Sequence, residues 1–249
     1  MILLLRKRFI GYAFLLGCVS GAVLVDSVGQ TPATTSQPAG DSGVAATKAQ
    51  MTKLRDDFVK ATADAGFTCP IAPPAISVVD VPSYGNYDPQ TNTLETPAWE
   101  QLSEAERGRF FRLLGPGTTE AAAREEFETG AHHWVFIHEM GHWWQACRGV
   151  VDRGKHYAIE FGANRIAAAY WKDHDPQVVA HQRAVFEGIL KRHPNPVGDA
   201  QNIEAYFDAN YEKLGPTPAY IWFQARMCVA ALDEQPLPSF AQALKQTTP

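Results

Sequence analysis

The chain has 249 residues, of which 45% are apolar and 20% are charged. This balance is typical of a folded globular protein and excludes a disordered or collagen-like chain. The net charge of −5 argues against a protein that binds nucleic-acid phosphates through a basic surface. The chain is long enough to bury one large hydrophobic core or two small ones.

Residues 1–22 have the pattern of a secretory signal peptide. Three consecutive basic residues at positions 6–8 precede an apolar run over residues 9–16, and small residues follow. A positive segment, an apolar segment and a small-residue cleavage site are typical of such signals. Two alternatives stay open, namely lipidation of Cys18 and an uncleaved anchor over residues 9–25. All three predict export of the chain's body to the periplasm, the cell envelope or the medium.

Residues 23–47 are predicted to form a flexible linker, because Thr, Ser, Pro, Ala and Gly dominate much of this stretch. Residues 48–249 are predicted to form one domain. It begins with a helix over residues 52–65, and a β-branched strand follows over residues 76–81. Turn residues on either side of an extended stretch between residues 84 and 96 indicate a small antiparallel meander.

The chain after residue 118 is predicted to be almost entirely helical. Capping residues mark helix starts at Thr96, Ser103, Asp175 and Thr217, and all but Ser103 are followed directly by proline. Since the strands come early and the helices late, the predicted fold class is α+β, with a small, mostly antiparallel N-terminal sheet and a helical C-terminal part.

Three cysteines, Cys69, Cys147 and Cys228, lie outside the signal segment. An exported chain can form one disulfide among them, which leaves one thiol over, and the sequence does not indicate the pair. Their isolated positions do not match the paired spacing of a cysteine zinc site.

The motif His138-Glu139-Met140-Gly141-His142 lies in a run with no proline and many large apolar residues, which predicts a helix. Residues four apart share one helix face, so both imidazoles can reach one metal ion at about 2.0–2.1 Å. A carboxylate directly after the first histidine can contact a water on that metal without binding the metal itself. The preceding His132 and His133 are predicted to be polar positions at the start of this helix.

A third metal ligand is predicted at Glu160, on a second helical run whose neighbours are small or apolar. A glycine-containing loop between the two runs allows them to pack antiparallel, so that Glu160 faces the same metal. Asn164 lies one turn further along this run, and its side-chain oxygen can accept a hydrogen bond from an imidazole N–H.

These residues resemble the gluzincin branch of zinc metallopeptidases, to which thermolysin belongs. The resemblance covers about 35 residues and implies a zincin-like fold, in which the sheet packs on the motif helix. It implies one catalytic zinc ion bound by His138, His142 and Glu160, with Glu139 as general base. The family usually has Asp where this chain has Asn164, so the orienting role is kept and the negative charge is not.

The resemblance implies a secreted or envelope-associated hydrolase that cleaves a peptide or protein substrate. It contacts a membrane only through an N-terminal anchor or lipid, and it binds no nucleic acid. A Tyr or His is expected to stabilise the oxyanion, and Tyr211 is favoured because it lies near the end of a predicted helix. The other candidates are His156, Tyr157, Tyr206 and Tyr220.

Two alternative functions stay open. One is a non-catalytic, zinc-stabilised module that binds peptides. The other is a metal-dependent amidase that acts on a cell-wall component.

Overall fold

The structure is a computed structural model that describes residues 39–81, 83–198, 202–215 and 217–247. The predicted signal peptide, the alternative anchor and Cys18 lie outside the described residues, as does the first part of the predicted linker. In the described part of the chain, no helix is both long and apolar enough to span a bilayer.

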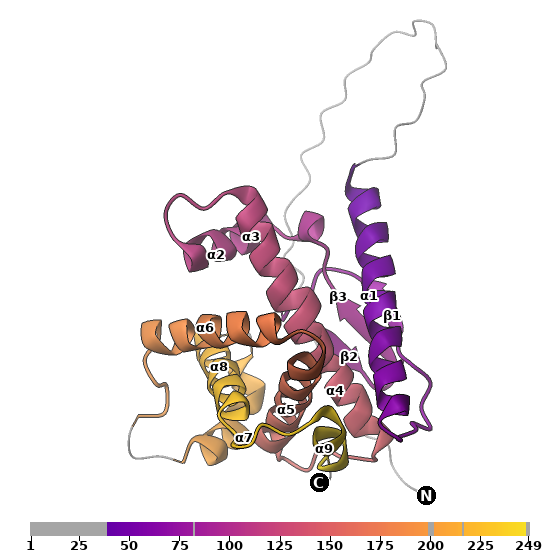
Figure 1. Ribbon diagram of the computed structural model, residues 1–249. Helices are drawn as coiled ribbons and strands as arrows, with labels where there is room; N and C mark the ends of the chain where they lie inside the picture. The colour runs from indigo at the N-terminus through magenta and orange to yellow at the C-terminus, as the bar shows by residue number, and fades with distance from the viewer. Residues whose placement is uncertain (1–38, 82, 199–201, 216, 248–249) are drawn as a thin grey trace, which may run out of the picture. The chain divides into compact units, whose positions relative to one another are not determined.

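Helix α1 (Ala39–Asp64) begins within the predicted linker, so the linker boundary at residue 47 and the helix start at residue 52 are both wrong. Thr47 and Met51 lie on its buried side, at 6% and 0% exposure. Burial of this face, together with several alanines of high helix propensity, outweighs the Gly and Ser residues that indicated a linker. Figure 1 shows α1 lying beside the sheet.

Three short strands, β1 (Ala75–Val78), β2 (Asn86–Asp88) and β3 (Thr93–Thr96), form one sheet in the order β1-β3-β2. The antiparallel hairpin of β2 and β3 was predicted, but β1 pairs with β3 in parallel, so the sheet is mixed. Strand β3 follows β2 in the sequence but lies between β1 and β2 in the sheet. It runs antiparallel to β2 and parallel to β1. The α+β class is confirmed.

The register of the sheet aligns apolar residues on one buried face. Ile76 and Tyr87 are both opposite Leu94, and all three belong to the main hydrophobic core. This face lies against helix α4 (Phe136–Cys147), whose Ile137 and Met140 are fully buried. The sheet is therefore packed on the motif helix, as predicted.

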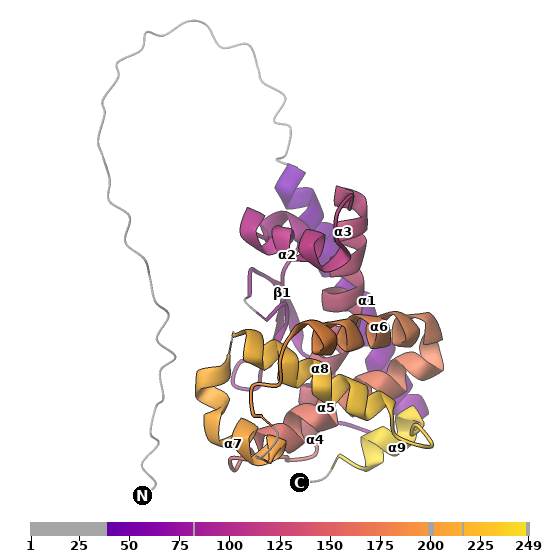
Figure 2. The same ribbon diagram turned by 90° about the vertical axis from the view of Figure 1, so that its left-hand side faces the viewer.

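Helices make up most of the remaining described chain, in agreement with the prediction (Figures 1 and 2). The predicted caps at Ser103, Asp175 and Thr217 are confirmed, each accepting a backbone N–H from the first turn of its helix. The predicted start at Thr96 is wrong, because Thr96 ends strand β3. The further elements are a 3₁₀ turn η1 (Trp99–Gln101), α2 (Glu104–Leu114), α3 (Glu120–Phe127), a π-helix η2 (Glu128–Val135), α5 (His156–His174), α6 (Pro176–Arg192), α7 (Ile203–Leu214), α8 (Pro218–Leu232) and α9 (Phe240–Lys245).

The π-helix η2 joins α3 to α4 without a break, so that His132 and His133 lie inside a long helical run. The prediction that they are polar positions at a helix start is wrong, since His132 is 2% exposed. The true start of the run is capped by Thr119.

Two features fix α4 against its neighbours. Gly141 faces Ala163 of α5 so closely that an added Cβ would lie 3.0 Å from the Ala163 Cα, and this lets the two helices pack tightly. A disulfide joins Cys147, at the end of α4, to Cys69 ahead of β1, whereas Cys228 is a buried free thiol. The pairing that the sequence left open is thereby resolved.

Candidate metal centre

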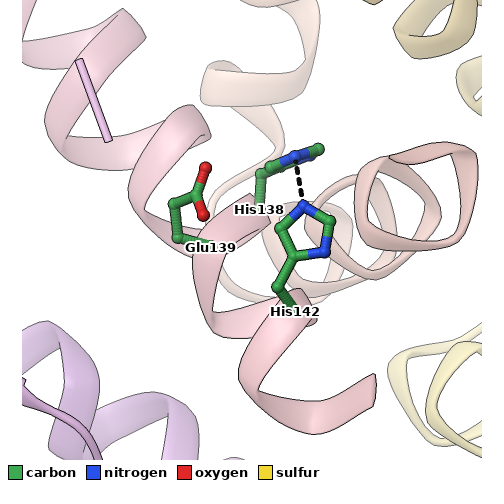
Figure 3. Close-up of side chains that lie close together, drawn as sticks. All are labelled: His138, Glu139 and His142. Atoms are coloured by element: carbon green, nitrogen blue, oxygen red, sulfur yellow. Dashed lines mark hydrogen bonds between the residues drawn. The ribbon is translucent and has the colours of Figure 1, made fainter. Parts of the chain in front are cut away.

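His138 and His142 project from one face of α4 toward each other. Their Nε2 atoms lie 3.0 Å apart, with the two rings nearly perpendicular (Figure 3). The His138 side chain is 9% exposed and that of His142 is 18% exposed. The predicted spacing on a helix therefore brings two nitrogen atoms to one buried point.

The other ring nitrogen of each histidine has a side-chain partner. His142 Nδ1 lies 2.8 Å from Gln145 Oε1, and His138 Nδ1 lies 3.2 Å from Asn164 Oδ1. The Gln145 amide nitrogen donates to the Ile159 carbonyl, so the Gln145 oxygen must be the atom that faces His142. Both Nδ1 atoms therefore donate, and in the neutral rings both Nε2 lone pairs converge.

Glu160, on α5, completes this convergence. Its Oε2 lies 3.1 Å from His138 Nε2 and 3.7 Å from His142 Nε2, and the residue is 5% exposed. The two carboxylate oxygens also accept hydrogen bonds, Oε1 from the Tyr211 hydroxyl at 2.9 Å and Oε2 from the Gln224 amide at 2.8 Å. A buried anion thus faces two nitrogen lone pairs, an arrangement that requires a proton or a metal cation between them.

The three donor atoms fit a tetrahedral zinc ion. Ligand atoms that each bind one zinc at about 2.0–2.1 Å lie about 3.3 Å apart. The observed separations of 3.0, 3.1 and 3.7 Å bracket this value. Two imidazoles and one carboxylate are also a donor set that zinc accepts, and they leave a fourth position for water or substrate.

Glu139 lies on α4 beside the two histidines, and strand β2 holds its carboxylate in place. Its Oε2 accepts the Tyr87 backbone N–H of strand β2 at 2.8 Å, and the residue is 9% exposed. Strand β2 approaches this closely because residue 85 is glycine: an added Cβ would lie 2.6 Å from Val135 and 3.1 Å from the Glu139 side chain. The donor atoms of His138, Glu139 and His142 lie within 4.8 Å of one another, so this group can hold a metal ion.

The electrostatics reflect the demand for positive charge. Burial lowers the pKa of His142, but the hydrogen bond and charge of Glu160 outweigh it and raise that pKa to about 9. Burial raises the pKa of Glu160, but hydrogen bonds from His138 and His142 hold it well below its usual value. Burial and the Glu160 charge together raise the pKa of the Tyr211 hydroxyl, so this group stays a donor.

The structure clusters six of the predicted site residues, namely His138, Glu139, His142, Glu160, Asn164 and Tyr211, the last of which lies on α7. Tyr211 also stacks on His156, with ring centroids 4.0 Å apart, and His156 pairs with Asp152 at 2.8 Å. Of the other predicted oxyanion candidates, Tyr220 accepts a hydrogen bond from Gln224, whereas Tyr206 stacks on a core phenylalanine.

Sequence reasoning missed four supporting residues. Gln145 lies three residues after His142 on the same helix, so its spacing was a usable signal. Trp134 lies four residues before His138 on the same helical run, so its spacing was a signal as well, whereas Gln224 and Cys228 carry none, because only the fold brings α8 to the centre. All three contact Asn164.

No protein-family model matches this chain, and neither the curated proteins nor the solved structures yield a match. The resemblance to gluzincins therefore rests on the residues of α4 and α5 and on their geometry.

Proposed function

We propose that this protein is a zinc metallopeptidase of the gluzincin type, with a zincin-like arrangement of sheet and motif helix. His138, His142 and Glu160 bind the zinc ion, and Glu139 is the general base. The observation that carries the proposal is the convergence of two imidazole lone pairs and one carboxylate oxygen at separations of 3.0–3.7 Å.

Glu160 fits the third ligand position better than Glu139 does. Glu160 Oε2 lies 3.1 Å from the nearer imidazole nitrogen, and both of its oxygens are held by hydrogen-bond donors. Oε2 of Glu139 instead accepts a backbone N–H of β2. This arrangement leaves Glu139 beside the centre, where a base is needed.

A zinc ion in this site would supply a water of lowered pKa and a Lewis acid for a carbonyl oxygen. Glu139 would accept the proton of the attacking water and donate it to the leaving amine. The Tyr87 N–H bond fixes one Glu139 oxygen and leaves the other to move the proton. The hydrogen bonds that His138 Nδ1 donates to Asn164 and His142 Nδ1 donates to Gln145 keep both imidazoles in the tautomer that exposes Nε2.

Tyr211 is proposed as the donor to the developing oxyanion. In this structure its hydroxyl donates to Glu160 Oε1. Its raised pKa keeps the proton on the phenol. To stabilise the oxyanion, the hydroxyl would stop donating its hydrogen bond to Glu160 and donate it to the substrate oxygen instead. The stacked His156 ring would support the tyrosine ring in both positions.

The proposed substrate is a peptide or protein in extended form. Strand β2 pairs with β3 along one edge only, and its other edge faces Glu139, so a substrate strand would add there. We propose that the protein is exported. The Cys69–Cys147 disulfide supports this, because disulfides persist mainly in oxidising compartments.

The test uses the full chain with zinc and a broad peptide library. Glu139→Gln should still bind one zinc ion per chain, and peptide hydrolysis should fall by about 10²–10⁴-fold because the general base is lost. The matched control is Glu126→Gln, a buried carboxylate that pairs with His181 outside the centre, and it should retain hydrolysis. Undiminished hydrolysis by Glu139→Gln would overturn the proposed mechanism.

A non-catalytic zinc-stabilised module is the second candidate, and burial favours it. His138, Glu139 and Glu160 are 7%, 9% and 5% exposed, which is close to the enclosure of a structural site. This candidate predicts stoichiometric zinc, no cleavage of any library peptide, and unfolding on chelation. The peptidase predicts cleavage that chelation abolishes and zinc restores.

A further inference from the structure

Gln224 of α8 contacts two groups that support the metal centre. Its amide nitrogen donates to Glu160 Oε2 at 2.8 Å, and its amide oxygen accepts the Asn164 side-chain N–H at 3.1 Å. We propose that Gln224 is a positioning residue that orients the Asn164 amide and thereby selects the His138 tautomer that can bind metal. This inference rests on the proposed metal centre and adds a residue from a third helix to it.

The orientation of the Gln224 amide follows from its neighbours. An ionised carboxylate can only accept hydrogen bonds, so the Gln224 atom that faces Glu160 Oε2 must be the nitrogen. The second hydrogen of this nitrogen is donated to the Tyr220 hydroxyl at 2.8 Å. The oxygen of Gln224 is therefore directed at Asn164.

The orientation of Asn164 follows in turn. Because it meets an oxygen of Gln224, it presents its nitrogen there, and this nitrogen also donates to the Glu160 backbone carbonyl at 3.0 Å. Its Oδ1 consequently faces three groups, the Trp134 indole N–H at 3.4 Å, the Cys228 thiol at 2.9 Å and the His138 ring. The indole is a donor only, so it supports the same orientation independently.

The same assignment of donors and acceptors extends to His138. Since Asn164 Oδ1 accepts, His138 Nδ1 carries the proton, and the Nε2 lone pair is left for the metal. A chain of hydrogen bonds thus runs from the carboxylate ligand through Gln224 and Asn164 to the histidine ligand. Each end of the chain holds one of the three proposed metal ligands, so a change at Gln224 acts on both.

This arrangement also accounts for asparagine at position 164, where the resembling family usually has aspartate. Asn164 is 1% exposed, and its nitrogen donates to two acceptors. An aspartate would direct a second buried oxygen at those same acceptors, the Glu160 carbonyl and the Gln224 oxygen, which is costly without a donor. Asn164→Asp should therefore weaken zinc binding, although it restores the more usual residue.

The test measures zinc affinity of the full chain by competition with a chromophoric chelator. Gln224→Met keeps the size of the side chain and removes all three hydrogen bonds of its amide, and it should weaken zinc binding by about 10–100-fold, as loss of an orienting partner typically does. The matched control is Gln182→Met. Gln182 is 2% exposed, and its amide nitrogen has no partner in the described part of the chain, so zinc affinity should not change.

A second readout separates positioning from general stability. In the metal-free protein, at a pH high enough for the ring to be neutral, ¹⁵N spectra of the His138 ring should show the proton on Nδ1 in the wild type and a mixture of tautomers in Gln224→Met. Asn164→Asp provides a further variant if Gln224→Met does not fold. Asn164→Asp and Gln224→Met should also be non-additive in zinc affinity, because both remove the same Asn164–Gln224 bond.

The outcomes separate this inference from the proposed function. Wild-type zinc affinity and an unchanged His138 tautomer in Gln224→Met would overturn the role of Gln224 while the metal centre stands. Equal or tighter zinc binding by Asn164→Asp would also overturn it. If the wild type binds no zinc, both proposals fail. If it binds zinc without hydrolysing peptides, only the peptidase fails.

Discussion

Two pairs of histidines lie on one continuous helical run, and their surroundings differ. In α4, His138 and His142 each have an acceptor at Nδ1, and their Nε2 atoms converge on Glu160. In the π-helix η2, the Nδ1 atoms of His132 and His133 are buried with no partner in the described part of the chain. Burial lowers the pKa of both residues of this second pair.

The comparison shows that burial of a histidine does not by itself mark a metal site. His132 is more deeply buried than His138, yet its ring packs on Phe127 and its Nε2 meets the Pro97 carbonyl. A metal-binding pair is distinguished by the polarity of its hydrogen bonds, which leaves a lone pair on each ring directed at one point.

Removal of one histidine from each pair should separate them most clearly. His138→Ala deletes one of three proposed ligands and should weaken zinc binding by more than about 100-fold, the upper end of what an orienting partner alone contributes. His132→Ala should leave zinc affinity unchanged and affect only the free energy of unfolding. The measurements are chelator competition and urea denaturation. Equal loss of zinc in both variants would contradict the distinction between the pairs.

A disulfide also fixes the C-terminal end of helix α4, close to the metal centre. The Cys69–Cys147 disulfide closes a loop with a sequence separation of 78 residues. Its removal in the double variant Cys69→Ser/Cys147→Ser should lower the free energy of unfolding by about 2–5 kcal/mol, because the unfolded chain gains entropy. Denaturant unfolding of the metal-free protein measures this. Cys228→Ser is the control outside the disulfide, and a double variant of wild-type stability would contradict the expectation.

The part of the fold that the sequence predicts is the part encoded locally. Caps at Ser103, Asp175 and Thr217 and the i,i+4 pair of histidines depend on neighbouring residues, and the structure agrees with each of them. The α+β class follows from the order of strands and helices along the chain, whereas the packing of the sheet on α4 was expected only from the resemblance.

The predictions fail where contacts between residues far apart in the sequence determine the local structure. The helical state of residues 39–47 depends on burial of Thr47 and Met51, which composition does not reveal. Parallel pairing of β1 with β3 depends on where the hairpin inserts. At the site, Gln224 lies 64 residues from Glu160, and only the packing of α8 on α5 brings them together. A motif predicts ligands, whereas the groups that orient them come from the whole fold.

A smaller effect is expected where β2 meets the motif helix. Gly85→Ala would place a Cβ 2.6 Å from Val135 and 3.1 Å from the Glu139 side chain, so β2 must shift away from Glu139. We expect a loss of about 1–3 kcal/mol in stability, as for overpacking, and a fall in kcat with zinc still bound. The control on the π-helix is Gly130→Ala, whose Cβ would meet only Gln182 at 4.0 Å. A Gly85→Ala variant with wild-type stability and kcat would contradict the close approach.

The smallest effect concerns acid stability of the π-helix pair. Burial holds the pKa of His132 below the ordinary 6.5, so the unfolded chain takes up a proton at a pH where the folded chain does not. The associated stability is fully present above pH 6.5 and is lost as the pH falls below it, with a limiting slope of about 1.4 kcal/mol per pH unit for one proton. Burial of His133 acts in the same direction.

His132→Gln should therefore flatten the dependence of unfolding free energy on pH below 6.5, while leaving the contribution of His133 in place. Urea denaturation at a series of pH values, with chelator present in every sample, measures the difference between the two proteins without a contribution from zinc release. His193→Gln, which changes an exposed histidine, is the control and should follow the wild-type curve. Parallel curves for the wild type and His132→Gln would show that the folded protein protonates His132 as readily as the unfolded chain does. The unpartnered ring nitrogens of η2 would then carry no cost, and the contrast between the two histidine pairs would rest on zinc binding alone.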